Sequence, residues 1–211
     1  MDSLEINWPL DEESIQKITS AAKFDLLKAE EILKRSLGCN SQQYALIKKE
    51  QARLNIIMGN YESAYKEIRT ALDEIVNICL RRPESGHHLK AEFSLVRGDA
   101  EGKLELMSGQ KESLTTAESI YRNCFGDNHP MVASTLQKLC VRYLEVKNLK
   151  EASKYLEESG NICAVLKRGL QEQLASCNSD FLIKYNLDAH PILKRQLHLE
   201  KKIRPPQGAW Q

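Results

Sequence analysis

The chain has 211 residues, of which 28% are charged and 42% apolar, and its 30 basic and 29 acidic side chains give a net charge of +1. This balance excludes a general electrostatic attraction to nucleic acid or to anionic membranes, and no apolar run is long enough to span a bilayer. The six cysteines stand singly, without a CxxC pair, and the acidic start lacks the features of a signal peptide. We therefore expect a cytoplasmic protein with reduced thiols.

Apolar residues recur at three- and four-residue steps along most of the chain, which predicts α-helices joined by short turns. The expected helices are 11–37, 42–58, 61–81, 86–107, 110–125, 130–146, 149–167 and 169–185. Gly38 is expected to end the first helix in a left-handed conformation. Downstream, Asp127 or Asn128 is expected to cap a helix that restarts at Pro130.

Three segments are predicted from these patterns. An acidic segment occupies residues 1–10, a helical domain residues 11–187, and a basic tail residues 188–211. The tail is expected to form one more short helix before Pro205 and Pro206, and an extended, flexible segment after it.

A pattern of small and large residues occurs twice. Its first copy contains Ala52, Gly59, Asn60, Tyr61, Ala64, Ile68 and Ala71, and its second contains Cys140, Asn148, Leu149, Ala152, Leu156 and Ser159. Small side chains let two antiparallel helices approach closely, and large ones fill the space between neighbouring hairpins. A weaker middle copy at 91–125 places Gly102 and Gly109 at the small positions, with Leu114 replacing a third. This pattern resembles the tetratricopeptide repeat.

The segment Tyr121 to Ala133, with its Phe-Gly-Asp-Asn-His-Pro turn, is similar to the longer tetratricopeptide repeats of kinesin light chains and to the carboxy-terminal helical domains of SET and MYND methyltransferases. The resemblance implies an all-α fold, a right-handed superhelical stack of antiparallel helical hairpins. In such repeats the first helix of each hairpin lines a concave groove. Carried over to this sequence, the groove residues are Lys49, Arg53, Ile56, Asp99, Lys103, Gln137, Lys138 and Val141. The lysines and the arginine would make the groove basic and suited to an acidic peptide or helix.

The resemblance favours a non-enzymatic scaffold or adaptor that binds another protein, in a cytoskeletal or ciliary assembly by analogy. We expect no cofactor, because no phosphate-binding loop or activated nucleophile is evident, and no metal, because adjacent His87 and His88 cannot point at one ion. Three alternatives remain open. They are a regulatory region of a larger SET/MYND-like enzyme, a nucleic-acid-binding module that uses the basic tail and Trp210, and a homodimer.

Overall fold

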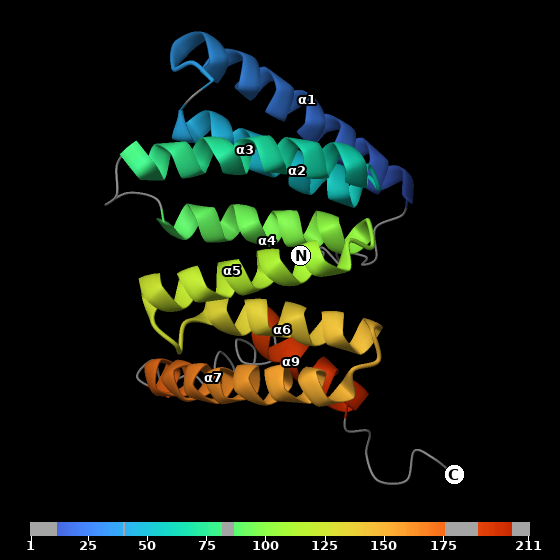
Figure 1. Ribbon diagram of the computed structural model, residues 1–211, viewed down its shortest axis with the longest axis vertical. Helices are drawn as coiled ribbons and strands as arrows, with labels where there is room; N and C mark the ends of the chain where they lie inside the picture. Colours follow the sequence, from blue (N-terminus) through green and yellow to red (C-terminus); the bar gives the residue numbers. More distant parts are fainter. Residues whose placement is uncertain (1–11, 40, 82–86, 176–189, 204–211) are drawn as a thin grey trace, which may run out of the picture. The chain divides into compact units, whose positions relative to one another are not determined.

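The computed structural model describes residues 12–39, 41–81, 87–175 and 190–203, and every element within these ranges is an α-helix (Figure 1). The all-α class and the pairing of helices in hairpins, both expected from the sequence, are confirmed for these residues. The chain divides into two compact units, Met1–Ser85 and Gly86–Gln211. The helical domain expected at 11–187 includes residues of both units.

The first unit contains α1 (Glu12–Ser36), α2 (Gln42–Ile57) and α3 (Tyr61–Arg81). Gly38 follows α1 with a φ of 77°, as its position predicts. Ser41 caps α2, because its hydroxyl accepts a hydrogen bond from the Tyr44 N–H at 3.2 Å. The fully buried Ala52 and Ala64 let α2 and α3 pack closely.

The second unit contains α4 (His87–Lys103), α5 (Met107–Phe125), α6 (Pro130–Glu145), α7 (Leu149–Ala175) and α9 (Pro191–Ile203). The hairpin of α4 and α5 stacks on the hairpin of α6 and α7 through contacts between α5 and α6 (Figure 1). The core of the second unit consists of residues from all five helices, among them Leu95, Leu114, Tyr121, Leu136, Ile162 and Leu193. The last helix, α9, contacts both α6 and α7.

The cap of α6 differs from the one expected. Neither Asp127 nor Asn128 occupies the cap position. His129 holds it, and its Nδ1 accepts a hydrogen bond from the Met131 N–H at 3.2 Å. Its ring also stacks on Phe125 at a centroid distance of 4.4 Å. Pro130 occupies the first turn of the helix, where a missing N–H costs nothing.

In each of the three hairpins, a three-residue turn of the same geometry connects the first helix to the second. The middle residue of each turn, Gly59, Glu105 or Lys147, has a φ between 58° and 79°. Each turn also makes the same three backbone hydrogen bonds, to carbonyls four, three and five residues back. The turns therefore align the three hairpins residue by residue, although only the first carries a glycine at the left-handed position.

This alignment corrects the repeat register expected for the middle hairpin. Gly98, not Gly102, stands where Ala52 and Cys140 stand. Leu114 does not replace a small residue, because it aligns with Ile68 and Leu156, and all three are buried. A methyl group on Gly98 would lie 3.1 Å from Leu114, so the glycine makes room for the leucine.

At one equivalent position in each hairpin, where its two helices cross, the side chains that pair with each other differ. Asn55 donates to the Glu67 carboxylate at 2.9 Å between α2 and α3, and the Ser113 hydroxyl donates to the buried Glu101 at 2.7 Å between α4 and α5. Between α6 and α7, Tyr143 and Tyr155 stack at 5.4 Å. The hairpins thus share a backbone arrangement but have distinct interiors, which disfavours pairing of the wrong helices.

One boundary differs from the sequence prediction near the carboxy terminus. No helix break separates residues 167 and 169, because α7 continues through Gly169 to Ala175. Residues 191–203 of the predicted tail form α9, the short helix expected before Pro205, and this helix contacts α6 and α7. The remainder of the expected helix 169–185, the acidic segment 1–10 and the segment after Pro205 lie outside the described residues.

Candidate functional site

The structure places the predicted groove residues on the first helix of each hairpin, as expected. Lys49, Arg53 and Ile56 lie on α2, Asp99 and Lys103 on α4, and Gln137, Lys138 and Val141 on α6. The residues on α2 belong to the first unit and the remaining five to the second. Each unit therefore contributes its own set of predicted groove residues.

On α2, the residues expected to be exposed together differ in burial. Arg53 is exposed and pairs with Glu50 at 3.1 Å. Lys49 is only 5% exposed and its amine lies 3.3 Å from the same carboxylate. The expectation that Lys49 faces the groove is wrong, because its position aligns with the buried Leu95 and Gln137 of the other hairpins. The long alkyl chain of a lysine can fill such a site while its amine remains near a carboxylate.

On α4 and α6, one of the two predicted groove lysines is paired with a carboxylate. The Lys138 amine reaches from α6 to α4 and binds both carboxylate oxygens of Asp99, one of them at 2.6 Å. Lys49 and Arg53 share the single carboxylate of Glu50, so three of the four cations expected to attract an acidic peptide are in ion pairs with two carboxylates. Lys103, the fourth, is exposed at the end of α4.

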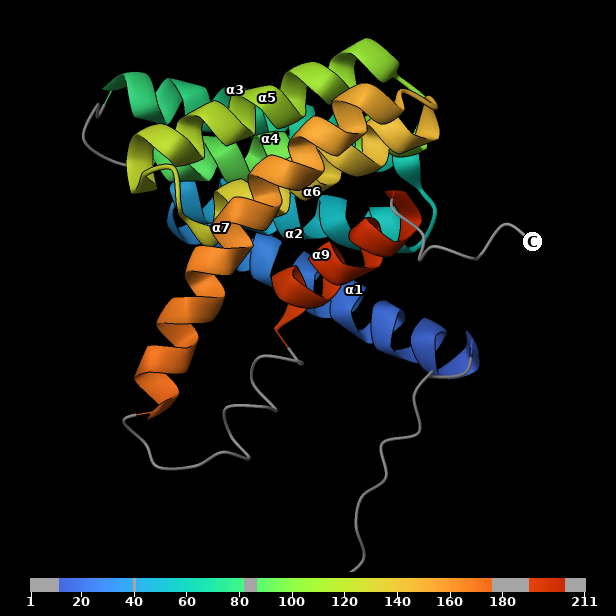
Figure 2. The same ribbon diagram turned by 90° about the horizontal axis from the view of Figure 1, so that it is seen from below.

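The face of α6 carries a helix from the same chain. α9 lies against α6 and α7 (Figure 2), and it buries Gln137 completely. The Gln137 amide donates to the carbonyl of Ile192 at 2.9 Å and to the side chain of Gln196 at 3.2 Å. The expectation that Gln137 is exposed to a partner is therefore wrong, since α9 covers it.

Gln196 is the polar centre of this contact. Its oxygen accepts from the Ser159 hydroxyl at 2.7 Å as well as from Gln137, and its amide nitrogen donates to the Leu156 carbonyl at 3.0 Å. A methyl group on Gly160 would lie 3.0 Å from that nitrogen, so this glycine gives the amide its space. The surface of α6 and α7 thus recognises one glutamine side chain through both of its polar atoms.

Leucines flank the glutamine on either side. Leu193, one turn before Gln196, joins the core around Leu136 and Ile162, and Leu199, one turn after it, packs with Cys140 and Leu156. Val141, Leu144 and Ile203 lie at the edge of the second cluster. The predicted groove residue Val141 is therefore partly buried against a cluster that includes Leu199 of α9.

The buried cysteines of this region have no reactive character. Burial raises the pKa of Cys140 and of Cys163 to about 11. A neutral thiol is a poor nucleophile and a poor metal ligand. Both residues act as small apolar side chains at the helix contacts.

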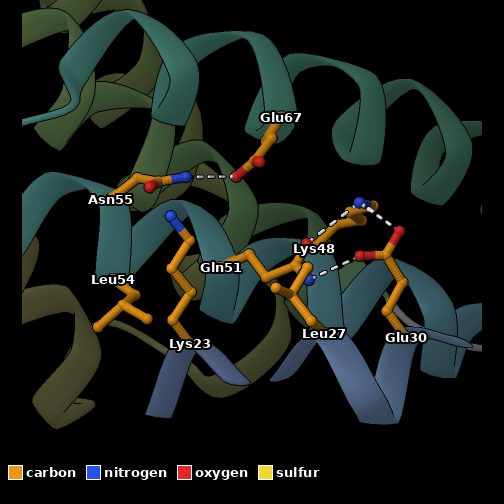
Figure 3. A pocket seen from close by; sticks show the side chains of 8 residues that line it. All are labelled: Lys23, Leu27, Glu30, Lys48, Gln51, Leu54, Asn55 and Glu67. Carbon is orange, nitrogen blue, oxygen red and sulfur yellow. Dashed lines mark hydrogen bonds and ion pairs between the residues drawn. The ribbon is translucent and has the colours of Figure 1, made fainter. Parts of the chain in front are cut away.

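The first unit contains a small polar pocket that sequence analysis did not find. Its volume is about 110 Å³, and it lies among α1, α2 and α3 with Lys23, Leu27, Glu30, Lys48, Gln51, Leu54, Asn55 and Glu67 around it (Figure 3). Glu30 binds Lys48 at 2.6 Å and accepts from Gln51 at 2.7 Å. Burial raises the pKa of Glu30, but these hydrogen bonds outweigh it and hold the pKa below its usual value. The carboxylate therefore fixes α1 to α2, and elsewhere in the lining Asn55 is paired with Glu67.

Metal ligands do not cluster anywhere in the described part of the chain. His88 lies 6.1 Å from the ring of Phe125, and the side chain of His87 lies outside the described residues. Nor does any described helix have the length and apolar character needed to cross a membrane.

One of three comparisons with known proteins found a similar architecture. No protein-family model matches the sequence, and no curated protein matches it significantly. Among solved structures, the crystal structure of BtubC (BKLC) from P. vanneervenii is similar, with a TM-score of 0.56 and 14% sequence identity. The similarity covers 92% of this chain and 76% of that one. At this identity it shows a shared helical-repeat fold.

Proposed function

We propose that this chain is a non-enzymatic scaffold of the tetratricopeptide type that binds a helical segment of another protein on the first helices of its hairpins. The repeated turn, the small residues at the helix crossings and the similarity to BtubC (BKLC) support a protein-interaction role. The cytoskeletal or ciliary setting suggested by the kinesin light chain resemblance is part of the same proposal.

The observation that carries the proposal is the occupation of α6 by α9. The α6 face, predicted from the sequence to hold a partner, holds an amphipathic helix together with the adjoining surface of α7, through two leucines and a glutamine. A groove that accepts the apolar face of a helix is a recurring mode of protein recognition. The paired charges at Asp99 and Lys138 favour a helix of mixed polarity over a strongly acidic peptide.

Site-specific crosslinking tests this proposal. A photoreactive amino acid is placed in the full chain at Arg53 or Lys103, which are exposed on first helices, and as matched controls at Thr70 or Ser119, which are exposed on second helices. We expect one partner protein to be crosslinked from the first helices and not from the second. Equal crosslinking from both sets, or crosslinking from the second helices alone, would refute a binding surface on the first helices.

A further inference from the structure

The α9 helix is held by a narrow contact surface. Of its described side chains only Leu193, Gln196 and Leu199 are buried, at 8%, 4% and 2% exposure, and they occur at three-residue intervals along one face. Leu197, between them in sequence, is 57% exposed. Helix α7, by contrast, buries Ala152, Leu156, Ser159, Ile162 and Cys163 along its length. α9 therefore buries fewer apolar side chains against the second unit than α7 does.

The centre of the contact is polar and incompletely satisfied. Gln196 accepts from Ser159 and Gln137 and donates to the Leu156 carbonyl. The Oε1 atom of Gln137 is buried without a hydrogen-bond partner among the described residues. The orientation of the Gln137 side-chain amide is set by its nitrogen, which donates to the carbonyl of Ile192 and to Gln196. An unsatisfied buried acceptor weakens the association of α9, and a helix that brought a donor to it would bind more tightly.

Specificity and weak attachment occur together at this surface. The two apolar sites and the glutamine site between them select a helix by sequence, because each polar atom of the glutamine has a partner on α6 or α7. A helix with an aliphatic side chain at the central position would lose the hydrogen bonds of Gln196 to Gln137, Ser159 and the Leu156 carbonyl, and the Ser159 hydroxyl would be left with the Leu156 carbonyl, 3.0 Å away, as its acceptor. The surface has the properties of a binding site for an exchangeable helix.

We infer that α9 is an internal ligand of the α6 and α7 surface, and that a partner protein displaces it with an amphipathic helix carrying the same Leu-x-x-Gln-x-x-Leu arrangement. This inference rests on the proposed function and names the partner element. While α9 is bound, only the fraction of molecules with an open site binds a partner, which lowers the apparent affinity by that fraction. The site is thus closed by the chain itself until a better-matched helix arrives.

The test uses the full chain and a fluorescent peptide of residues 190–204 as the competing helix. In Leu199→Asp the bound helix of the chain is weakened, so we expect the peptide to bind at least about tenfold more tightly than to the unaltered chain. Leu197→Asp introduces the same charge on the same helix at an exposed position and is expected to leave peptide binding unchanged. A peptide carrying Gln196→Leu is expected to bind Leu199→Asp at least about tenfold more weakly than the parent peptide.

A second measurement needs no variant. Hydrogen exchange on the unaltered chain is expected to show α9 amides exchanging at least about tenfold faster than those of α6 and α7, through opening of α9 alone. Equal protection of the three helices would overturn the inference, as would the absence of peptide binding to a folded Leu199→Asp chain. Concentration-dependent dimers that exchange α9 between copies would also overturn it, because the occupant would then be a second copy. If these results fail while crosslinking from Arg53 or Lys103 succeeds, the scaffold function stands without an internal ligand.

Discussion

Two glycines with open surroundings make a sharp test of the fold, because the same substitution is expected to have opposite effects at the two positions. Gly59 is the middle residue of the turn between α2 and α3, with a φ of 79°, and Gly169 lies within α7. A methyl group added to either glycine would meet nothing within 4 Å. Any change in stability must therefore come from the backbone.

The expected magnitudes follow from backbone preferences. Alanine in the left-handed region costs roughly 1–2 kcal/mol, and the loss of chain entropy in the unfolded state returns about 0.4–1 kcal/mol. Gly59→Ala should therefore lower the free energy of unfolding of the first unit by about 1 kcal/mol. Gly169→Ala should raise the stability of the second unit by about 0.8–1.0 kcal/mol, the difference in helix propensity between the two residues.

Urea denaturation followed by helical circular dichroism measures both changes, with the midpoint compared at an unchanged slope. Because the chain forms two units, hydrogen exchange assigns each change to its own unit. A neutral Gly59→Ala would refute the left-handed turn and with it the alignment of the three hairpins. A destabilising Gly169→Ala would refute the continuity of α7 through this residue.

Three further outcomes are expected. Glycine at Lys147 or Glu105, the left-handed residues of the other two turns, should stabilise the second unit by about 0.5–1 kcal/mol in the same denaturation assay, and a loss of stability would contradict the shared turn. At pH 8 a soluble alkylating agent should modify the exposed Cys124 first and reach Cys140 and Cys163 only after unfolding, as followed by mass spectrometry, because burial raises both pKa values to about 11. Burial raises the pKa of Glu30, but its hydrogen bonds lower the pKa below the unfolded value, so this carboxylate stabilises the first unit at neutral pH, and its contribution disappears as the pH falls through the folded pKa. Glu30→Gln should therefore be less stable at pH 7, and its stability should change less between about pH 5 and 3. An unchanged dependence of stability on pH would contradict the role of the ion pair between Glu30 and Lys48.

The helix positions were largely predictable because they depend on local chemistry. Gly38, the turn at Gly59 and Pro130 act within a few residues of their own position, and the structure places helix ends near each. The break expected before residue 169 was wrong for a related reason. A glycine within a helix costs only about 1 kcal/mol, which the packing of a long helix easily exceeds.

The register of the middle hairpin was harder to predict because its residues compensate in pairs. Gln110 stands where the other hairpins have Ala64 and Ala152, and Gly102 on the facing helix makes room for it, since a methyl group there would clash with the Gln110 amide nitrogen. Each exchange of a large for a small residue preserves the helix contact but removes the sequence pattern. The turn geometry, which Glu105 and Lys147 adopt without glycine, was not visible in the sequence at all.

The burial of Gln137 shows why groove residues could be assigned to helices but not to solvent. A polar residue on the first helix of a hairpin is expected to be exposed unless another segment covers it, and the segment that does so here is distant in sequence. The signal available was in α9, where Leu193, Gln196 and Leu199 lie on one face and basic residues such as Lys194 lie outside it. That pattern indicates that the helix has a buried side, but it does not say on what. Pairing the glutamine of α9 with a glutamine on α6 required the three-dimensional structure, and under the proposed scaffold function this pairing makes the last hairpin the place where selection of a partner helix is best defined.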